Sequence, residues 1–408
     1  MKPRYWLFVF ALLAITKFLN PFGVISSPQA GKFMFYLAAC LGMVLAMTGH
    51  TRLPKGSYPR WAYIAVMFGI VSSVVMVYLY QDQSLSTTVI ATLPYFFGYL
   101  FFYILMKLNI DKRLVLKTVF IMAFVGMVAY LVNAAVFPSV VFGSDRSEED
   151  VDMTRGIARL SIPYFDFIVL LFFYAINQWI SAKKNRGKWM IIIALTSVFI
   201  LLSVTRQKIG LAAVLGLWFI MVNASMWKRI LVVVLCAVLV FVVIPQIPFV
   251  NTMIELTETQ SEKNKYEEED IRIQAWRYYT IENQTNAITP IFGNGIAAFG
   301  KSDWGRKFES EIYFNRCFYV DVGWAGFFYL FGGIATVGLL ILLFIAAVKR
   351  KRPEETYLSY WMVFTIITSI ASAPILYYSQ IFYISTVLYL IYGYERNESY
   401  GSNNSQLQ

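Results

Sequence analysis

Arginines recur in the polar segments of a sequence that is otherwise dominated by long hydrophobic runs. A guanidinium group is planar and can bind two oxygens of a phosphate through parallel hydrogen bonds. Fixed cations also stabilise the charge that develops on a diphosphate leaving group as its bond to a sugar breaks. The alternative for each arginine is an ordinary salt bridge with a neighbouring acid. The set comprises Arg155, Arg159, Arg206, Arg272, Arg277, Arg306 and Arg316.

An acid near these arginines could act as a general base. Asp321 stands just before a hydrophobic run that begins at Gly323, and its carboxylate could accept the proton of an attacking hydroxyl. The same position suits the N-cap of the following helix, and the two roles are compatible. Glu309 and Glu311 are further acidic candidates a short distance upstream.

Three more residues are candidates for substrate binding. Lys208 follows Arg206 closely between two hydrophobic runs, where it either faces a substrate or extends toward the membrane surface. Asp166 falls inside a hydrophobic run, and an acid at membrane depth is a functional candidate by default. Trp276 offers a flat apolar face that suits a sugar ring, although such aromatic residues also line membrane interfaces.

The hydrophobic runs that must position these residues indicate a membrane protein. Aliphatic and aromatic residues make up 58% of the chain and charged residues 14%, which is outside the range of ordinary soluble domains. Many runs reach about twenty residues, the length of helix that crosses the hydrocarbon core. We therefore predict an all-α fold, a polytopic bundle of about 12 transmembrane spans that forms a single integral membrane domain over residues 1–408. The spans are expected near 5–19, 33–48, 61–80, 87–106, 114–137, 160–181, 188–204, 209–225, 228–244, 323–348, 357–373 and 375–393.

Basic residues fall in every second loop, which places those loops and both termini in the cytoplasm. The loops at 138–161 and 245–322 are then extracytoplasmic, and the second is expected to carry short amphipathic helices from Ile271 onward. The polar tail at 397–408 is predicted to be a disordered cytoplasmic segment. Since the net charge of +11 arises largely from the short basic loops, no nucleic-acid partner is expected.

The residue types predict neither a metal nor a cofactor. The only histidine, His50, falls in a loop expected to be cytoplasmic, so it cannot act on the outer side. Asp150 and Asp152 have the spacing of a metal motif found in nucleotide-sugar enzymes. They stand in an acidic run, however, and a solvated loop is the better interpretation.

Three patches between residues 155 and 345 carry a resemblance to a known family. The first runs from Arg159 to Pro163 at the entry to a hydrophobic run, and the second from Ser203 to Lys208 at a turn. The third extends from Arg272 through Trp276 to the Gly293-Asn294-Gly295 turn. In their order, these patches resemble the O-antigen ligases and the O-antigen, capsule and exopolysaccharide polymerases, which are polytopic membrane proteins.

A spacing motif of the ligase branch helps to choose within this family. It aligns with Asp321, Gly323, Gly333 and Thr336, but the ligases have a histidine where Asp321 stands and a polar residue where Gly323 stands. The resemblance therefore favours the polymerase branch. It implies a metal-independent glycosyltransferase that polymerises or ligates oligosaccharides linked to a polyprenyl (undecaprenyl) diphosphate. The reaction would take place at the outer face of the bacterial cytoplasmic (inner) membrane.

The resemblance also implies roles for particular residues. Asp321, Arg206 and Arg272 would be catalytic, with Asp321 as base and the arginines at the diphosphate. The expected substrate-binding set is Arg155, Arg159, Lys208, Arg277, Trp276 and Asp166. The implied partners are the lipid-linked oligosaccharide donor, a glycan acceptor, the bilayer and other polysaccharide-assembly membrane proteins. The alternative function is a lipid-linked oligosaccharide flippase or transporter, which would need charged residues along a path open to both sides.

Overall fold

The chain forms helices throughout the part that the structure describes. This computed structural model describes residues 3–15, 18, 28–48, 58–137, 141–142, 160–182, 184, 186–203, 205–238, 270–349 and 351–393, and no strand occurs in them. Four helices there are long and apolar enough to cross a membrane: α3 (Arg60–Tyr80), α4 (Leu85–Leu108), α5 (Lys112–Ala135) and α14 (Gly323–Val348). The all-α class is confirmed and a membrane protein is indicated, while the total of about 12 spans stays a prediction.

Helices also lie in the other ranges that were expected to span the membrane. One of them begins later than expected, because Pro163 and the left-handed backbone of Tyr164 (φ 58°) precede it, and its first residue is Phe165 rather than a residue near 160. These helices are α1 (Pro3–Ile15), α2 (Pro28–Thr48), α6 (Phe165–Ser181), α7 (Arg186–Leu202), α8 (Arg206–Asn223), α9 (Met226–Val238), α15 (Thr356–Thr368) and α16 (Tyr378–Tyr392).

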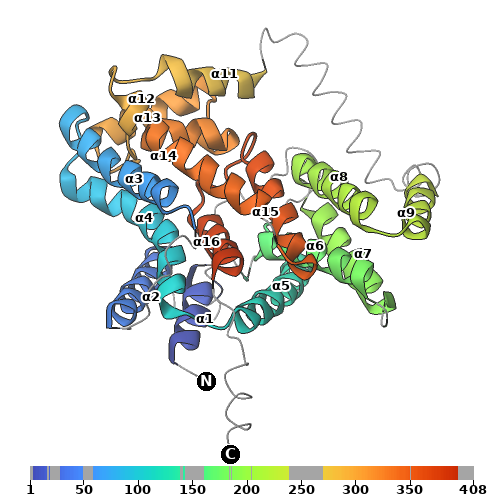
Figure 1. The fold of residues 1–408 in the computed structure, drawn as a ribbon. Coiled ribbons are helices and arrows are strands. Elements are labelled where there is room, and N and C mark those ends of the chain that lie inside the picture. Colours follow the sequence, from blue (N-terminus) through green and yellow to red (C-terminus); the bar gives the residue numbers. More distant parts are fainter. Residues whose placement is uncertain are drawn as a thin grey trace, which may run out of the picture.

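The long polar segment before α14 is itself largely helical. Its elements gather at the end of the molecule opposite to α1 and α2 (Figure 1). The prediction of short helices here is confirmed over residues 270–322, whereas 245–269, most of 138–161 and the tail at 397–408 lie outside the described residues. The elements are α11 (Ile271–Arg277), the π-helix η5 (Tyr278–Glu282), α12 (Thr289–Phe292), α13 (Asp303–Asn315) and the 3-10 helix η6 (Tyr319–Asp321).

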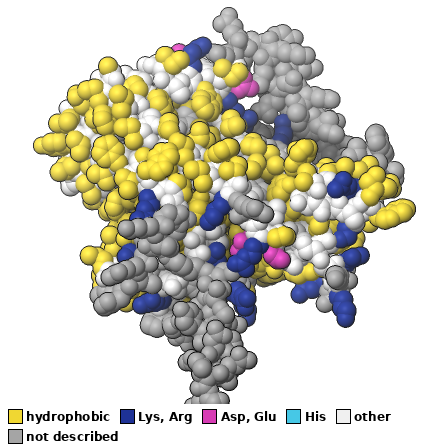
Figure 2. Space-filling model, in the orientation of Figure 1, with side chains coloured by type: hydrophobic (Ala, Val, Ile, Leu, Met, Phe, Trp, Pro, Cys, Tyr) yellow, Lys and Arg dark blue, Asp and Glu magenta, His cyan; other side chains and the backbone are white. Residues whose placement is uncertain are grey.

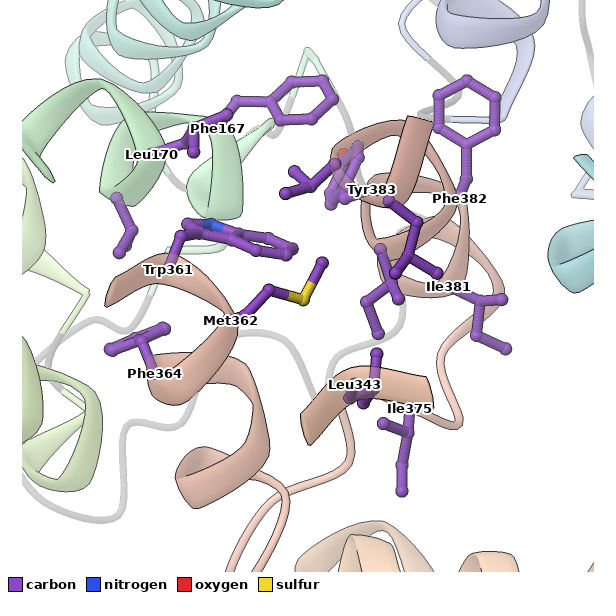
Figure 3. Packing of buried hydrophobic residues seen from close by; sticks show 14 of the residues in the cluster. Phe167, Leu170, Leu343, Trp361, Met362, Phe364, Ile375, Ile381, Phe382 and Tyr383 are labelled. Carbon is purple, nitrogen blue, oxygen red and sulfur yellow. The ribbon is translucent and has the colours of Figure 1, made fainter. Parts of the chain in front are cut away.

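One part of the buried hydrophobic core lies where α6, α15 and α16 meet. Figure 3 shows Phe167 of α6, Trp361 and Met362 of α15, and Tyr383 of α16 turned toward one another. The ring centroids of Phe167 and Tyr383 are 4.3 Å apart, and both side chains are buried. The Trp361 indole also donates a hydrogen bond to the carbonyl of Asp166 (2.8 Å), which satisfies its polar edge inside the core. This packing sets the relative heights of α6 and α15.

The outer surface of the helices is hydrophobic. Figure 2 shows hydrophobic side chains over most of the visible described surface, with lysines and arginines mainly in its middle and lower parts. On α3 the exposed apolar residues recur every three or four positions, which places them along one face of the helix. A patch of this extent on a water-soluble monomer would be unusual, whereas lipid covers it at no cost. The α3 residues are Trp61, Ile64, Phe68, Val71 and Val75.

A glycine turn locks the polar segment onto α14. Within α14 the backbone leaves the helical conformation at Gly332 (φ 77°), which frees carbonyl groups of the preceding turn. The amides of Asn294 and Gly295 donate to the carbonyls of Tyr329 (2.8 Å) and Leu330 (2.9 Å). Gly293 also has a positive φ of 89° and lies against the Leu330 carbonyl, where a side chain would collide. The Gly293-Asn294-Gly295 turn, which ends the third patch of the family resemblance, thus packs against α14.

The predicted orientation can be tested on the two sides of α14. We expect a cysteine at the exposed position Ser310 to react with a membrane-impermeant maleimide in intact spheroplasts. A cysteine at the exposed Glu354, beyond the other end of α14, should react only after permeabilisation. Both variants need a background in which Cys40, Cys236 and Cys317 are replaced. Labelling of both sites from one side would show that α14 does not cross, and the reverse pattern would invert the topology.

Candidate functional site

The C-terminal end of α15 gathers three separate elements of the chain. The last carbonyl groups of a helix have no partner within it, so they need donors from elsewhere. Here side chains of α14 and α8 donate to carbonyls in the last turn of α15, and a side chain of α11 donates to a carbonyl two residues beyond it. The bonds run from Trp324 Nε1 to the Ile366 carbonyl (3.0 Å), from Gln207 Nε2 to the Thr368 carbonyl (3.2 Å) and from Trp276 Nε1 to the Ile370 carbonyl (3.2 Å).

Asp321 and Arg272, both predicted to be catalytic, lie close enough to interact electrostatically. Arg272 is exposed in the first turn of α11, where the Asp270 carboxylate caps its amide (2.8 Å). Asp321 is exposed as well, but protein atoms packed around its carboxyl raise its pKa through partial desolvation. The positive charge of Arg272 lowers the same pKa, although it does not cancel the increase. A carboxylate with a raised pKa is a stronger base than an ordinary aspartate.

Asp321 does not cap α14, so this part of the sequence-based interpretation is wrong. The N-cap of α14 is Val322, and no side chain makes a capping hydrogen bond there. Backbone carbonyls of the linker between α15 and α16 satisfy the first amides instead. Gly323 donates to the Ser372 carbonyl (3.1 Å) and Trp324 to the Ser369 carbonyl (2.9 Å). The Asp321 carboxyl is therefore not needed for capping.

Arg206 and Lys208 lie in the first turn of α8, rather than in a turn between helices as expected. The first amides of a helix point outward and its macrodipole is positive at this end, so two cations there are disfavoured unless an anion is nearby. For Lys208 that anion is Asp166. The buried carboxyl of Asp166, with a residue exposure of 6%, interacts electrostatically with the Lys208 ammonium, which also lies 4.9 Å from the centre of the Phe165 ring.

Asp166 therefore has a structural partner. Its place in the first turn of α6 also suits the positive end of that helix. A buried charge with a partner is retained at much lower cost than an isolated one. The attraction between the two charges favours the packing of α8 beside α6.

Some of the predicted arginines make ordinary salt bridges. Arg277 Nε lies 2.7 Å from Glu282 Oε1 across the π-helix η5, and both side chains are about half exposed. Arg306 pairs with Asp303 at the surface of α13. For these two arginines the salt-bridge alternative is the one that the structure bears out, although a substrate role for Arg277 stays a prediction. Arg155 and Arg159 lie outside the described residues.

Metal ligands do not cluster in the described part of the chain. Among these residues no group of three or more histidine, cysteine or acidic side chains is placed to hold a metal ion. The site instead combines an acid, cations and hydrogen-bond donors. Such a set can bind a phosphorylated group and accept a proton.

Comparison with known proteins adds no assignment, because the chain matches no protein-family model and no curated protein. Its chemistry must therefore be read from its own residues. Sequence reasoning missed Gln207 and Trp324, whose side chains donate hydrogen bonds to carbonyls at the end of α15. A polar glutamine beside two cations in an apolar context was the available clue.

Proposed function

We propose that this chain is a membrane glycosyltransferase that uses a polyprenyl-diphosphate-linked oligosaccharide as donor. The observation that carries the proposal is the Asp321–Arg272 pair, in which an acid lies within electrostatic range of a cation. Because α11 and the first turn of α8 are both bonded to residues at or just beyond the end of α15, we infer that Arg206 belongs to the same site. Diphosphate departure and proton transfer require this combination.

The reaction follows from these roles. The oxygen of an acceptor hydroxyl attacks the anomeric carbon of the donor sugar, while the bond from that carbon to the diphosphate oxygen breaks. Asp321 accepts the hydroxyl proton, and Arg206 and Arg272 bind the diphosphate oxygens as negative charge develops on them. The amides in the first turn of α8 add donors for the same group. The products are a lengthened glycan and free polyprenyl diphosphate.

The family resemblance supplies the biological setting of the proposal. The site would face the outer side of the bacterial cytoplasmic membrane, with both termini in the cytoplasm. The acceptor would be another lipid-linked unit in a polymerase, or a different glycan in a ligase. The product would become O-antigen, capsule or exopolysaccharide. Lysines and arginines in alternate loops support this orientation.

The decisive experiment is reconstitution. Purified protein in liposomes with lipid-linked repeat units should release polyprenyl diphosphate in proportion to the new glycosidic bonds, which gel electrophoresis resolves as longer chains. A flippase would instead move a labelled lipid-linked unit across the bilayer without forming longer chains. That second result would replace the proposal with the transport alternative.

A pH profile tests the coupling between Arg272 and Asp321. Because Arg272 lowers the pKa of Asp321, its removal should raise that pKa. A base acts in its deprotonated form, so we expect Arg272→Gln to shift the acidic limb of the kcat/KM profile to higher pH. The rate should also fall at every pH, since a diphosphate ligand is lost. Arg306→Gln, which removes the surface partner of Asp303, is the control and should leave the limb in place. If the acidic limb of Arg272→Gln does not shift, Arg272 does not affect the pKa of the catalytic base.

A further inference from the structure

Five tyrosines from four elements gather next to the candidate site. The Tyr95 hydroxyl on α4 lies close to those of Tyr319, Tyr377 and Tyr36, and the Tyr36 hydroxyl lies close in turn to that of Tyr378. Tyr36 belongs to α2, Tyr319 to η6, and Tyr377 and Tyr378 to the start of α16. We refer to these five residues as the tyrosine cluster.

Contacts around the cluster place it between α4, α14 and α16. Tyr99, one helical turn after Tyr95 on the same face of α4, donates a hydrogen bond to the Ile375 carbonyl (2.9 Å) just before α16. The Ser385 hydroxyl donates to the Gly98 carbonyl (2.7 Å), which holds α16 against α4 at the same level. The Tyr95 ring itself lies 5.4 Å from the Phe331 ring of α14. Tyr95 is therefore held near the start of α16.

The cluster reaches the surface of the protein and carries polar groups. Tyr377 is 45% exposed, and the other four tyrosines are partly exposed. In the first turn of α16, the Gln380 Oε1 atom is buried and has no hydrogen-bond partner among the described residues. A buried amide oxygen without a donor is costly, and a ligand hydroxyl is one group that could supply the donor.

The position of the cluster relative to Asp321 indicates which part of a substrate it would meet. Tyr319 precedes Asp321 by two residues in the same turn of η6. Arg272, by contrast, belongs to α11, which is bound to the α15 end through Trp276. Asp321 therefore has both Arg272 and the tyrosine cluster as neighbours. The cation suits a diphosphate, whereas tyrosines offer flat apolar faces and hydroxyls, which suit sugar rings.

We propose that the tyrosine cluster binds the sugar rings of the acceptor glycan and presents an acceptor hydroxyl to Asp321. The choice of ligand rests on the proposed glycan transfer. The position of the acceptor follows from the role of Asp321 as base, because the acceptor must lie beside Asp321 on the side away from the departing diphosphate. Tyrosines of a membrane-interface belt would share the exposure but would not bind an oligosaccharide.

The test measures binding separately from transfer. The probe is a set of oligosaccharides released by mild acid from the surface glycan of the producing strain, which carry no diphosphate or lipid. We expect saturable binding to purified protein, with a Kd that rises about tenfold in Tyr377→Ala, because one stacking contact is lost. Tyr95→Phe keeps its ring and should weaken binding less, through the lost hydroxyl. Tyr313→Ala removes a tyrosine of α13 that is even more exposed (59%), and this variant should bind like the wild type.

The outcomes separate this inference from the proposed function. Inorganic pyrophosphate serves as the second probe, and its Kd should not change in the tyrosine variants. If the binding of both probes weakens equally in the tyrosine variants, the effect is a general structural one and the inference is overturned. It is also overturned if the wild type does not bind the oligosaccharides, or if their Kd is unchanged in Tyr377→Ala. If liposomes show no glycan transfer but oligosaccharide binding depends on Tyr377, the proposed enzyme activity fails while the glycan site stands.

Discussion

Arg206→Ala is expected to abolish glycan transfer, with a loss of about 100-fold or more in kcat/KM, while protein abundance stays near normal. Arg206 is the first residue of α8, and in the proposed reaction its guanidinium binds the diphosphate oxygens of the donor as negative charge develops on them. Removal of one charge-stabilising group from an active site typically costs 10²–10³ in rate.

Two further variants make the Arg206 result specific. Arg206→Lys should restore little activity, because an ammonium cannot reproduce the two parallel hydrogen bonds of a guanidinium. Arg186→Ala is the matched control, since Arg186 is likewise the first residue of a neighbouring helix, α7, and its Nε donates only to the Ala182 carbonyl among the bonds described. It should keep wild-type activity. Full activity of Arg206→Ala in reconstituted liposomes would remove Arg206 from the site.

Asp321→Asn should lower the transfer rate by about 10²–10⁴, the usual worth of general-base assistance. Asparagine has nearly the same shape as aspartate but cannot accept the proton. Because α14 is capped by the Ser369 and Ser372 carbonyls, neither Asp321→Asn nor Asp321→Ala should lower the melting temperature appreciably. A loss of transfer rate in these variants can therefore be attributed to catalysis rather than to lower stability.

The measurement is turnover of purified variants on lipid-linked repeat units across pH. Asp303→Asn, which changes an exposed acid on α13, serves as the control and should retain activity. Pyrophosphate binding to Asp321→Asn should persist, since the arginines remain. If the Asp321→Asn rate stays within a few-fold of the wild type, Asp321 is not the base. Glu309 and Glu311 on α13 would then be the next candidates, although the Tyr278 hydroxyl already lies 3.5 Å from Glu311 Oε2.

Local composition was enough to predict where the helices lie. A run of about twenty apolar residues has few alternatives to a helix in a membrane, because every backbone amide and carbonyl must find a partner within the segment. This reasoning located all four long apolar helices to within a few residues. It also identified the polar segment around α11 and singled out Arg272 and Asp321. Charged residues at positions that lipid disfavours can be recognised from the sequence alone.

Contacts between distant segments could not be predicted in the same way. Asp321 was read as a possible helix cap because it precedes Gly323, yet the cap comes from carbonyls about fifty residues later in the chain. The partners of Asp166 and Trp276 likewise lie in other segments of the chain, Lys208 on α8 and Ile370 just after α15. Apolar helices carry little information about their neighbours, since lipid and protein are equally apolar surroundings for them.

The sequence alone thus determined that the chain is a helical membrane protein with cations and acids in its polar segments. Folding determined which of those charges meet. Carbonyls at and just beyond the end of α15 accept hydrogen bonds from side chains of α8, α11 and α14, and these contacts cannot be read from any one of the four segments. Tertiary contacts of this kind also bring Arg272 near Asp321, the pair on which the proposed chemistry depends.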